Sequence, residues 1–84
     1  MSEIYKKHII NPKAGQRPSG RWSGQILIYR EHGNHGTETS FTIKGDFESK
    51  EQAISTAIAA GKWKIDKGYD DSNAVQNLDP ANFI

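Results

Sequence analysis

The first half of the chain alternates apolar and polar positions, which is the two-residue period of a β-strand. Residues 3–10 (EIYKKHII) are rich in β-branched and aromatic side chains, residues 21–30 (RWSGQILIYR) alternate most clearly, and residues 38–44 (ETSFTIK) resume the alternation. These three segments predict a three-stranded antiparallel meander. The side chains predicted to face inward from the second and third strands are Trp22, Ile26, Ile28, Thr39, Phe41 and Ile43.

The segments between these strands have the composition of turns. Residues 11–20 (NPKAGQRPSG) contain two prolines, two glycines and no large apolar side chain, and they predict a loop. Such a loop is long for a hairpin connection, and long loops with basic residues often bind ligands. Residues 32–36 (HGNHG) predict the second turn, because glycine and asparagine tolerate positive φ.

After Gly45 the period of the pattern changes to that of a helix. Ser49 followed by Gln52 forms a capping-box pattern, which marks a helix start. Apolar positions then recur at helical spacing and predict an amphipathic helix across one sheet face. The stripe consists of Ile54, Ile58, Gly61 and Ile65, widened by Ala53 and Ala57. Gly61 predicts either a close approach of the helix to the sheet or an early end of the helix, and Gly68 is the alternative end.

The predicted fold class is therefore α+β: a three-stranded antiparallel sheet followed by one helix. We expect a single β-β-β-α domain over residues 1–69. Residues 70–84 show no sustained period, so we expect an irregular C-terminal tail held by Leu78 or Phe83.

Size and composition narrow the classes of protein. A chain of 84 residues without cysteine is expected to fold by packing alone, and roughly 60% of its unfolded surface becomes buried. Little apolar material remains for a buried active site. No apolar run approaches the ~20 residues of a membrane span, and residues 1–10 lack a signal-peptide core. We therefore expect a cytoplasmic, bacterial-type protein that does not contact membranes.

The net charge of +1 is unevenly distributed along the chain. Residues 1–30 contain six basic residues and one acidic residue, a net charge of +5, whereas residues 31–60 have −3 and residues 61–84 have −1. This asymmetry suggests a basic surface that could meet an anionic partner. A self-complementary monomer or dimer would explain it equally well.

Several short motifs resemble those of known families. The motifs are Gly20-Arg21-Trp22 at the start of a strand, Gly45 and Phe47 after the third strand, and Ser49, Ala53 and Ala57 at the helix start. Over about residues 8–65 they resemble the APETALA/ERF-type DNA-binding domain and the arm-type domain of tyrosine recombinases, although the dense Arg/Trp set of the plant family is absent. Residues 45–53 (GDFESKEQA) also resemble the region before the helix in HicB-type antitoxins and in small bacterial β-β-β-α proteins of unknown function.

The resemblance implies a sheet whose helix-free face is available for binding. Strand parity assigns to this open face Tyr5, Lys7, Ser23, Gln25, Leu27, Tyr29, Ser40, Thr42 and Lys44. Such side chains can contact phosphates and base edges, and a short β-ribbon or sheet fits the major groove of DNA. A merely solvated or protein-binding face would have the same composition. The candidate nucleic-acid contacts are Lys7, Lys13, Arg17, Arg21, Gln25, Tyr29 and Lys44.

Trp63 lies nine positions after Ile54, which would place it opposite the Ile54 side of a continuous helix, between Lys62 and Lys64. An exposed tryptophan flanked by lysines could stack a base or anchor a partner. Alternatively, the tail covers Trp63 with Leu78, Phe83 or Ile84, or a helix break at Gly61 turns it inward.

Other motifs do not amount to a chemical site. Residues 15–22 nearly match a phosphate-binding loop, but they precede a strand and lack the Lys-Ser/Thr pair, so we reject that reading. His32 and His35, next to Glu31, lie in a Gly-rich turn without a third ordered ligand, and a polar turn is the better interpretation. No catalytic motif is present.

The sequence thus predicts a non-enzymatic binding module without cofactor, metal or small-molecule substrate. DNA is the most concrete ligand, bound through the basic loop and the open sheet face. The alternative is a protein-interaction module or small homodimer that uses an edge strand or the surface of Lys62, Trp63 and Lys64.

Overall fold

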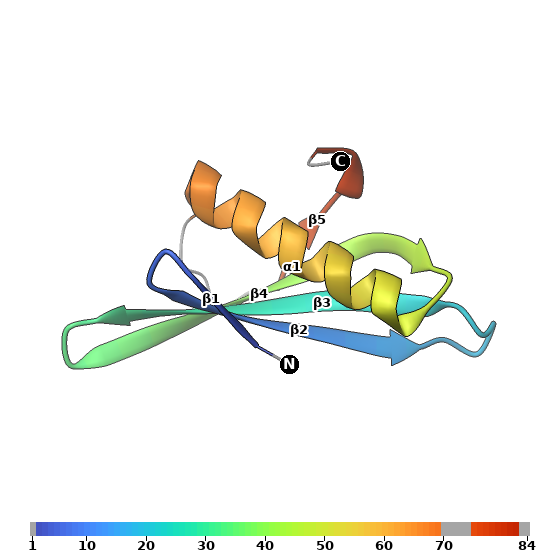
Figure 1. Cartoon of the computed structure of the whole chain (residues 1–84), viewed down its shortest axis with the longest axis horizontal. Coiled ribbons are helices and arrows are strands. Elements are labelled where there is room, and N and C mark those ends of the chain that lie inside the picture. Colours follow the sequence, from blue (N-terminus) through green and yellow to red (C-terminus); the bar gives the residue numbers. More distant parts are fainter. Residues whose placement is uncertain (1, 70–74, 83–84) are drawn as a thin grey trace.

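The computed structural model describes residues 2–69 and 75–82. In these residues a five-stranded sheet is covered on one face by a single helix (Figure 1). The strand order β1-β2-β3-β4-β5 follows the sequence. The elements are β1 (Glu3–Tyr5), β2 (His8–Gln16), β3 (Trp22–His32), β4 (His35–Phe47), α1 (Lys50–Lys67), β5 (Gln76–Leu78) and the short 3-10 helix η1 (Pro80–Asn82). The α+β class is confirmed, but the predicted three-stranded antiparallel sheet is wrong.

The N-terminal segment is a hairpin rather than one strand. β1 and β2 pair antiparallel with Tyr5 opposite His8, and Lys6 and Lys7 form the two-residue turn between them. Both lysines have positive φ, 47° and 67°. Two-residue hairpin loops of type I′ require positive φ at both residues and usually use Asn-Gly. The turn was missed because lysine rarely adopts it.

β2 continues through most of the segment that was predicted to be a loop. It pairs with β3 along its whole length, from His8 opposite Arg30 to Gln16 opposite Trp22. β1 pairs only with residues 8–10, so Pro12 lies where no described strand pairs with the outer edge of β2. Proline is tolerated in edge strands because its missing N–H removes no ladder bond there. The connection between β2 and β3 thus shrinks to residues 17–21.

The helix begins where the capping-box pattern predicts. The Ser49 hydroxyl accepts a hydrogen bond from the Gln52 N–H (3.1 Å), and the Gln52 side chain accepts one from the Glu48 N–H (2.9 Å). At the other end, Gly68 has φ 87° and its N–H donates to the Lys64 carbonyl at 2.9 Å. Of the two predicted helix ends, the structure therefore has the later one.

The core lies between α1 and the sheet. Ile26, Ile28, Phe41 and Ile43 are almost fully buried, as strand parity predicted, and Thr39 is buried with them. The helix contributes its small residues Ala53, Ala57, Ala60 and Gly61. A Cβ added at Gly61 would lie 2.9 Å from the Ile10 Cγ2 atom, so glycine allows the helix to approach β2 closely. The close-approach interpretation of Gly61 is thus confirmed.

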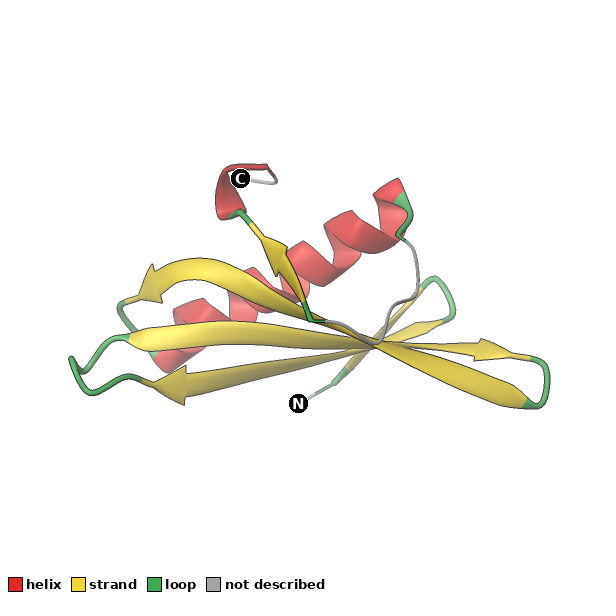
Figure 2. Ribbon diagram, turned by 180° about the vertical axis from the view of Figure 1, so that it is seen from behind, coloured by secondary structure: helices red, strands yellow, loops and turns green. Residues whose placement is uncertain are grey.

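The segment after the helix is not wholly irregular. β5 pairs parallel with the middle of β4, with Leu78 opposite Ile43. Figure 2 shows β5 rising from the sheet beside the helix, and Leu78 is only 4% exposed. The expectation of an irregular tail is therefore wrong for residues 76–78, whereas the anchoring role of Leu78 is supported. Phe83 lies outside the described residues.

Candidate functional site

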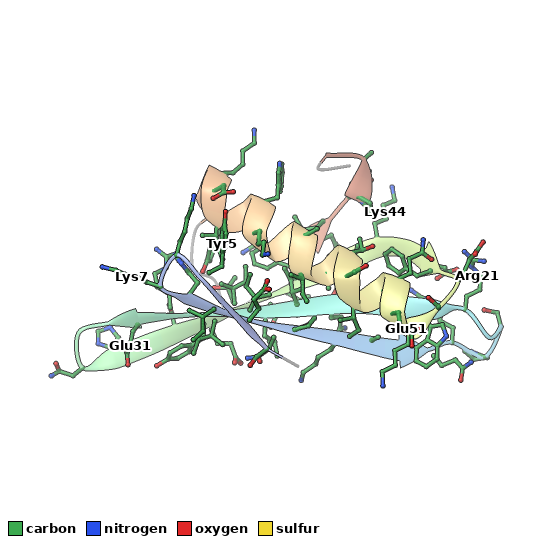
Figure 3. The ribbon with its side chains drawn as sticks, viewed as in Figure 1. Tyr5, Lys7, Arg21, Glu31, Lys44 and Glu51 are labelled. Carbon is green, nitrogen blue, oxygen red and sulfur yellow. The ribbon has the colours of Figure 1, made fainter. Side chains whose placement is uncertain are left out.

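The predicted nucleic-acid contacts do not form one surface. Lys7 projects from the β1–β2 turn, and Arg21 lies at the opposite end of the molecule (Figure 3). Lys44 stands above the arched end of β4. A register shift between β3 and β4 and a positive φ of 96° at Gly45 make the pairing of the two strands irregular there. Lys7 and Lys44 therefore lie away from Gln25 and Tyr29, with which strand parity had placed them on the open face.

The two loop arginines are held by an acidic residue. Arg17 forms an ion pair with Asp46, and the Arg21 Nε lies 3.9 Å from the other oxygen of the same carboxylate. Within the loop, the Gly20 N–H donates to the Arg17 carbonyl at 2.9 Å. The predicted long basic loop is thus a short turn, and Asp46 offsets one of its two charges.

Lys13 and Gln25 do meet on the helix-free face. They are register partners on β2 and β3, and Gln25 is in turn opposite Thr42 of β4. Thr42 lies opposite Asn77 of β5. Residues directly opposite each other share a sheet face. A row of ammonium, amide and hydroxyl groups therefore crosses four neighbouring strands on the face away from α1.

This polar row borders a concavity of about 240 Å³. Besides Lys13, Gln25 and Thr42, it is lined by Leu27, Ser40 and Val75, with Ile26 and Phe41 at the strands beneath. Val75 is 63% exposed. The concavity thus combines apolar walls with groups that can donate and accept hydrogen bonds. We call it the open-face concavity.

Tyr29 lies on the same face, two residues beyond Leu27. A Cβ added at Gly36 of β4 would lie 2.1 Å from the Tyr29 Oη atom and 2.3 Å from Cζ. The phenol ring therefore occupies the space above Gly36, where any other residue would displace it. Tyr29 is only partly buried in this position, so part of its ring remains accessible.

Tyr5, in contrast, does not lie on the open face. Its hydroxyl donates to both carboxylate oxygens of Asp66 on α1, at 3.1 and 3.0 Å. Lys6 forms an ion pair with the same carboxylate. The hydrogen bond from Lys6 lowers the pKa of Asp66 and correspondingly raises the pKa of Lys6. Parity failed for Tyr5 because the turn that follows it reverses the chain.

On the surface of Lys62, Trp63 and Lys64, the tryptophan is not fully exposed. Trp63 is half-buried and packs against the core, with the ammonium groups of Lys64 and Lys67 5.5 and 5.6 Å from its ring. Lys62 pairs with Glu3 at 3.0 Å. The helix is continuous, so Trp63 does lie opposite Ile54, but Ile54 flanks the buried alanine stripe rather than centring it, and the opposite side of the helix therefore still touches the core. Ile84, one of the proposed covers, lies outside the described residues.

Two parts of the candidate site were missed by sequence reasoning. Parity did place Ser40 and Thr42 on the open face, but nothing marked them as neighbours of Lys13, because β2 had been taken for a loop. Val75 and Asn77 gave no usable signal, since their position depends on the pairing of a three-residue strand with distant β4.

In the described part of the chain no three His, Asp or Glu side chains are grouped as metal ligands. The side chain of His32, one of the two histidines considered, lies outside the described residues. Within residues 2–69 and 75–82, no helix is both long and apolar enough to cross a bilayer. Comparisons with models of protein families, with curated proteins and with solved structures return no match.

Proposed function

We propose that this protein is a non-enzymatic nucleic-acid-binding module and that its ligand lies on the helix-free face of the sheet. The observation that supports this proposal is the row of Lys13, Gln25 and Thr42 beside the open-face concavity. It brings together a cation for phosphate and neutral groups for base edges, which are the two kinds of contact that such interfaces combine.

Each group has a defined role in the proposal. The exposed ammonium of Lys13 contacts a phosphate. The Gln25 amide, which both donates and accepts, reads a base edge together with the Thr42 hydroxyl. Tyr29 offers a ring on which a base can stack.

The test is a titration of fluorescently labelled oligonucleotides followed by anisotropy at several salt concentrations. Replacing Lys13 with Gln removes one phosphate contact and should reduce the log–log salt slope by about 0.7–0.9. Lys50→Gln is the matched control, since Lys50 is also exposed but lies at the start of α1 on the other layer. Absence of binding at low salt, or equal effects of the two variants, would overturn the proposal.

A second candidate function, contact with a protein, is favoured by exposed apolar residues. Ile4 is 77% exposed and pairs with Ile9, which is 36% exposed. A separate apolar groove of about 400 Å³ runs along Ile54 and Ile58 of α1. Exposed apolar surface of this kind often marks interaction sites. This function predicts a mass that rises with protein concentration, or capture of one partner, with loss on Ile4→Ser.

A further inference from the structure

We infer that the nucleic acid bound is an unpaired strand, one base of which lies in the open-face concavity. This inference rests on the proposed function and specifies its ligand. It follows from the width of the sheet, the positions of the charged side chains at its two ends, the volume of the concavity and the position of the Tyr29 ring above Gly36.

The sheet is too wide to enter a groove of duplex DNA. Neighbouring strands lie about 4.8 Å apart, so the four strands β2–β5 that meet at the polar row span about 14 Å. The major groove is about 12 Å wide and admits a helix or a two-stranded ribbon. The open face can therefore meet base edges only where the bases are not enclosed in a duplex.

A two-stranded ribbon is available, but its charge opposes such an approach. The β3–β4 hairpin extends beyond α1 and has Glu31 at its end (Figure 3). Glu38, the register partner of Tyr29, is also exposed but lies farther from the tip. The Glu31 carboxylate at the tip would face the phosphates that line a groove. At the other end of the sheet, Arg17 and Arg21 share Asp46, so that end also lacks the dense positive charge of a duplex-binding protein.

The concavity suits one aromatic ring. At about 240 Å³ it is smaller than the roughly 300–1,000 Å³ of pockets that hold drug-sized ligands. Leu27 and Val75 provide apolar surface for a ring, and Gln25, Ser40 and Thr42 provide hydrogen-bond partners for its edge. Sequence-specific contacts to single strands use this combination, because unpaired bases expose both their faces and their edges.

Tyr29 extends the site along β3. It is two residues from Leu27, about 7 Å along the strand. Gly36 leaves room for the phenol ring against the sheet, which fixes the ring without covering it fully. A strand lying along β3 would therefore meet the concavity and the ring in succession, with a second base stacked on Tyr29.

The experiment measures anisotropy with four labelled probes of equal length, about ten nucleotides, within the usual range for one binding domain. They are oligothymidine, oligodeoxyadenosine, oligouridine and a duplex of mixed sequence. The DNA and RNA probes distinguish the two sources of an unpaired strand. We expect tighter binding to at least one single strand than to the duplex. We expect its salt slope to be about −0.7 to −1.4, as for one or two phosphate contacts, rather than about −3.6 for four contacts on a duplex.

Matched variants test the two base contacts. Thr42→Val removes the hydroxyl and should weaken single-strand binding about three- to tenfold. Thr56→Val, a half-buried position on α1, is its control. Tyr29→Leu should weaken binding at least fivefold by the usual magnitude of base stacking, whereas Tyr29→Phe keeps the ring and should stay within about twofold. Circular dichroism of each variant confirms that the fold is retained.

The outcomes separate this inference from the proposed function. Preference for a single strand, with loss in Thr42→Val and Tyr29→Leu but not in their controls, supports the inference. Equal or tighter duplex binding, or binding unaffected by these variants, overturns it while the broader proposal stands. Failure of all four probes to bind overturns both.

Discussion

Replacing Gly61 with alanine tests the close contact between α1 and β2. The new Cβ would lie 2.9 Å from Cγ2, 3.1 Å from Cδ1 and 3.3 Å from Cγ1 of Ile10. Ile10 is fully buried, so it cannot swing into solvent. The substitution therefore creates overpacking, which costs about 1–3 kcal/mol.

Helix propensity acts in the opposite direction. Alanine stabilises a helix interior by about 1 kcal/mol relative to glycine. The two effects leave a net destabilisation of about 1 kcal/mol, which corresponds to a fall of about 4–8 °C in the melting temperature of a domain of this size. Without the contact, the same substitution would stabilise the protein by about 1 kcal/mol.

The assay is urea denaturation of four proteins: wild type, Gly61→Ala, Ile10→Val and the double variant. Ile10→Val removes Cδ1 and should lower the cost of Gly61→Ala by about 0.5 kcal/mol or more, because residues in contact couple. Ala59→Gly, at an exposed position of the same helix, measures the propensity term directly. A Gly61→Ala protein that is more stable than wild type by the amount that Ala59→Gly loses would refute the close approach.

Two further predictions concern the N-terminal hairpin. Lys7→Gly should stabilise the protein by about 0.5–1 kcal/mol in chemical denaturation, since Lys7 adopts a φ of 67° that costs an L-residue about 1–2 kcal/mol; an equal gain with Lys7→Ala would contradict this reason. Asp66 is held by Lys6 and Tyr5 with a lowered pKa, so its contribution to stability is present above its ordinary pKa of about 3.9 and is lost as the pH falls through the lowered value. Unfolding midpoints should therefore be higher for wild type than for Asp66→Asn at neutral pH and converge in acid, and equal midpoints at pH 7 would contradict it.

Local signals in the sequence located the helix well. Ser49 and Gln52 are only three residues apart in the chain and their side chains form the cap, so its position could be predicted from their spacing. The side chains of β3 and β4 that face the core could be predicted equally well, because apolar and polar residues alternate over many positions in both strands.

Elements that depend on distant partners could not be predicted. Pro12 and Gly15 indicate a loop locally, and only pairing with β3 makes them part of a strand. The same holds for β5, whose three residues pair with β4 more than thirty positions earlier. A turn made of two lysines likewise has no recognisable signature.

In the candidate site, too, features set by one strand could be predicted, whereas features set by distant contacts could not. Parity identified the face on which Gln25 and Tyr29 lie, since that depends on β3 alone. The ion pair between Arg17 and Asp46 joins segments 29 residues apart, and it offsets part of the positive charge that the sequence assigns to the loop. Charge counts along the chain therefore suggested a stronger basic surface than the fold provides.

The most direct test of the central claim is a two-dimensional ¹H–¹⁵N NMR titration of the labelled protein with the single strand that binds best. We expect the largest shifts in the backbone amides of Lys13, Gln25, Leu27, Tyr29 and Thr42. Amides of α1 should shift little, because the helix lies on the other face of the sheet. Absence of shifts at low salt, or shifts centred on Trp63 or on Ile54 and Ile58, would contradict the claim.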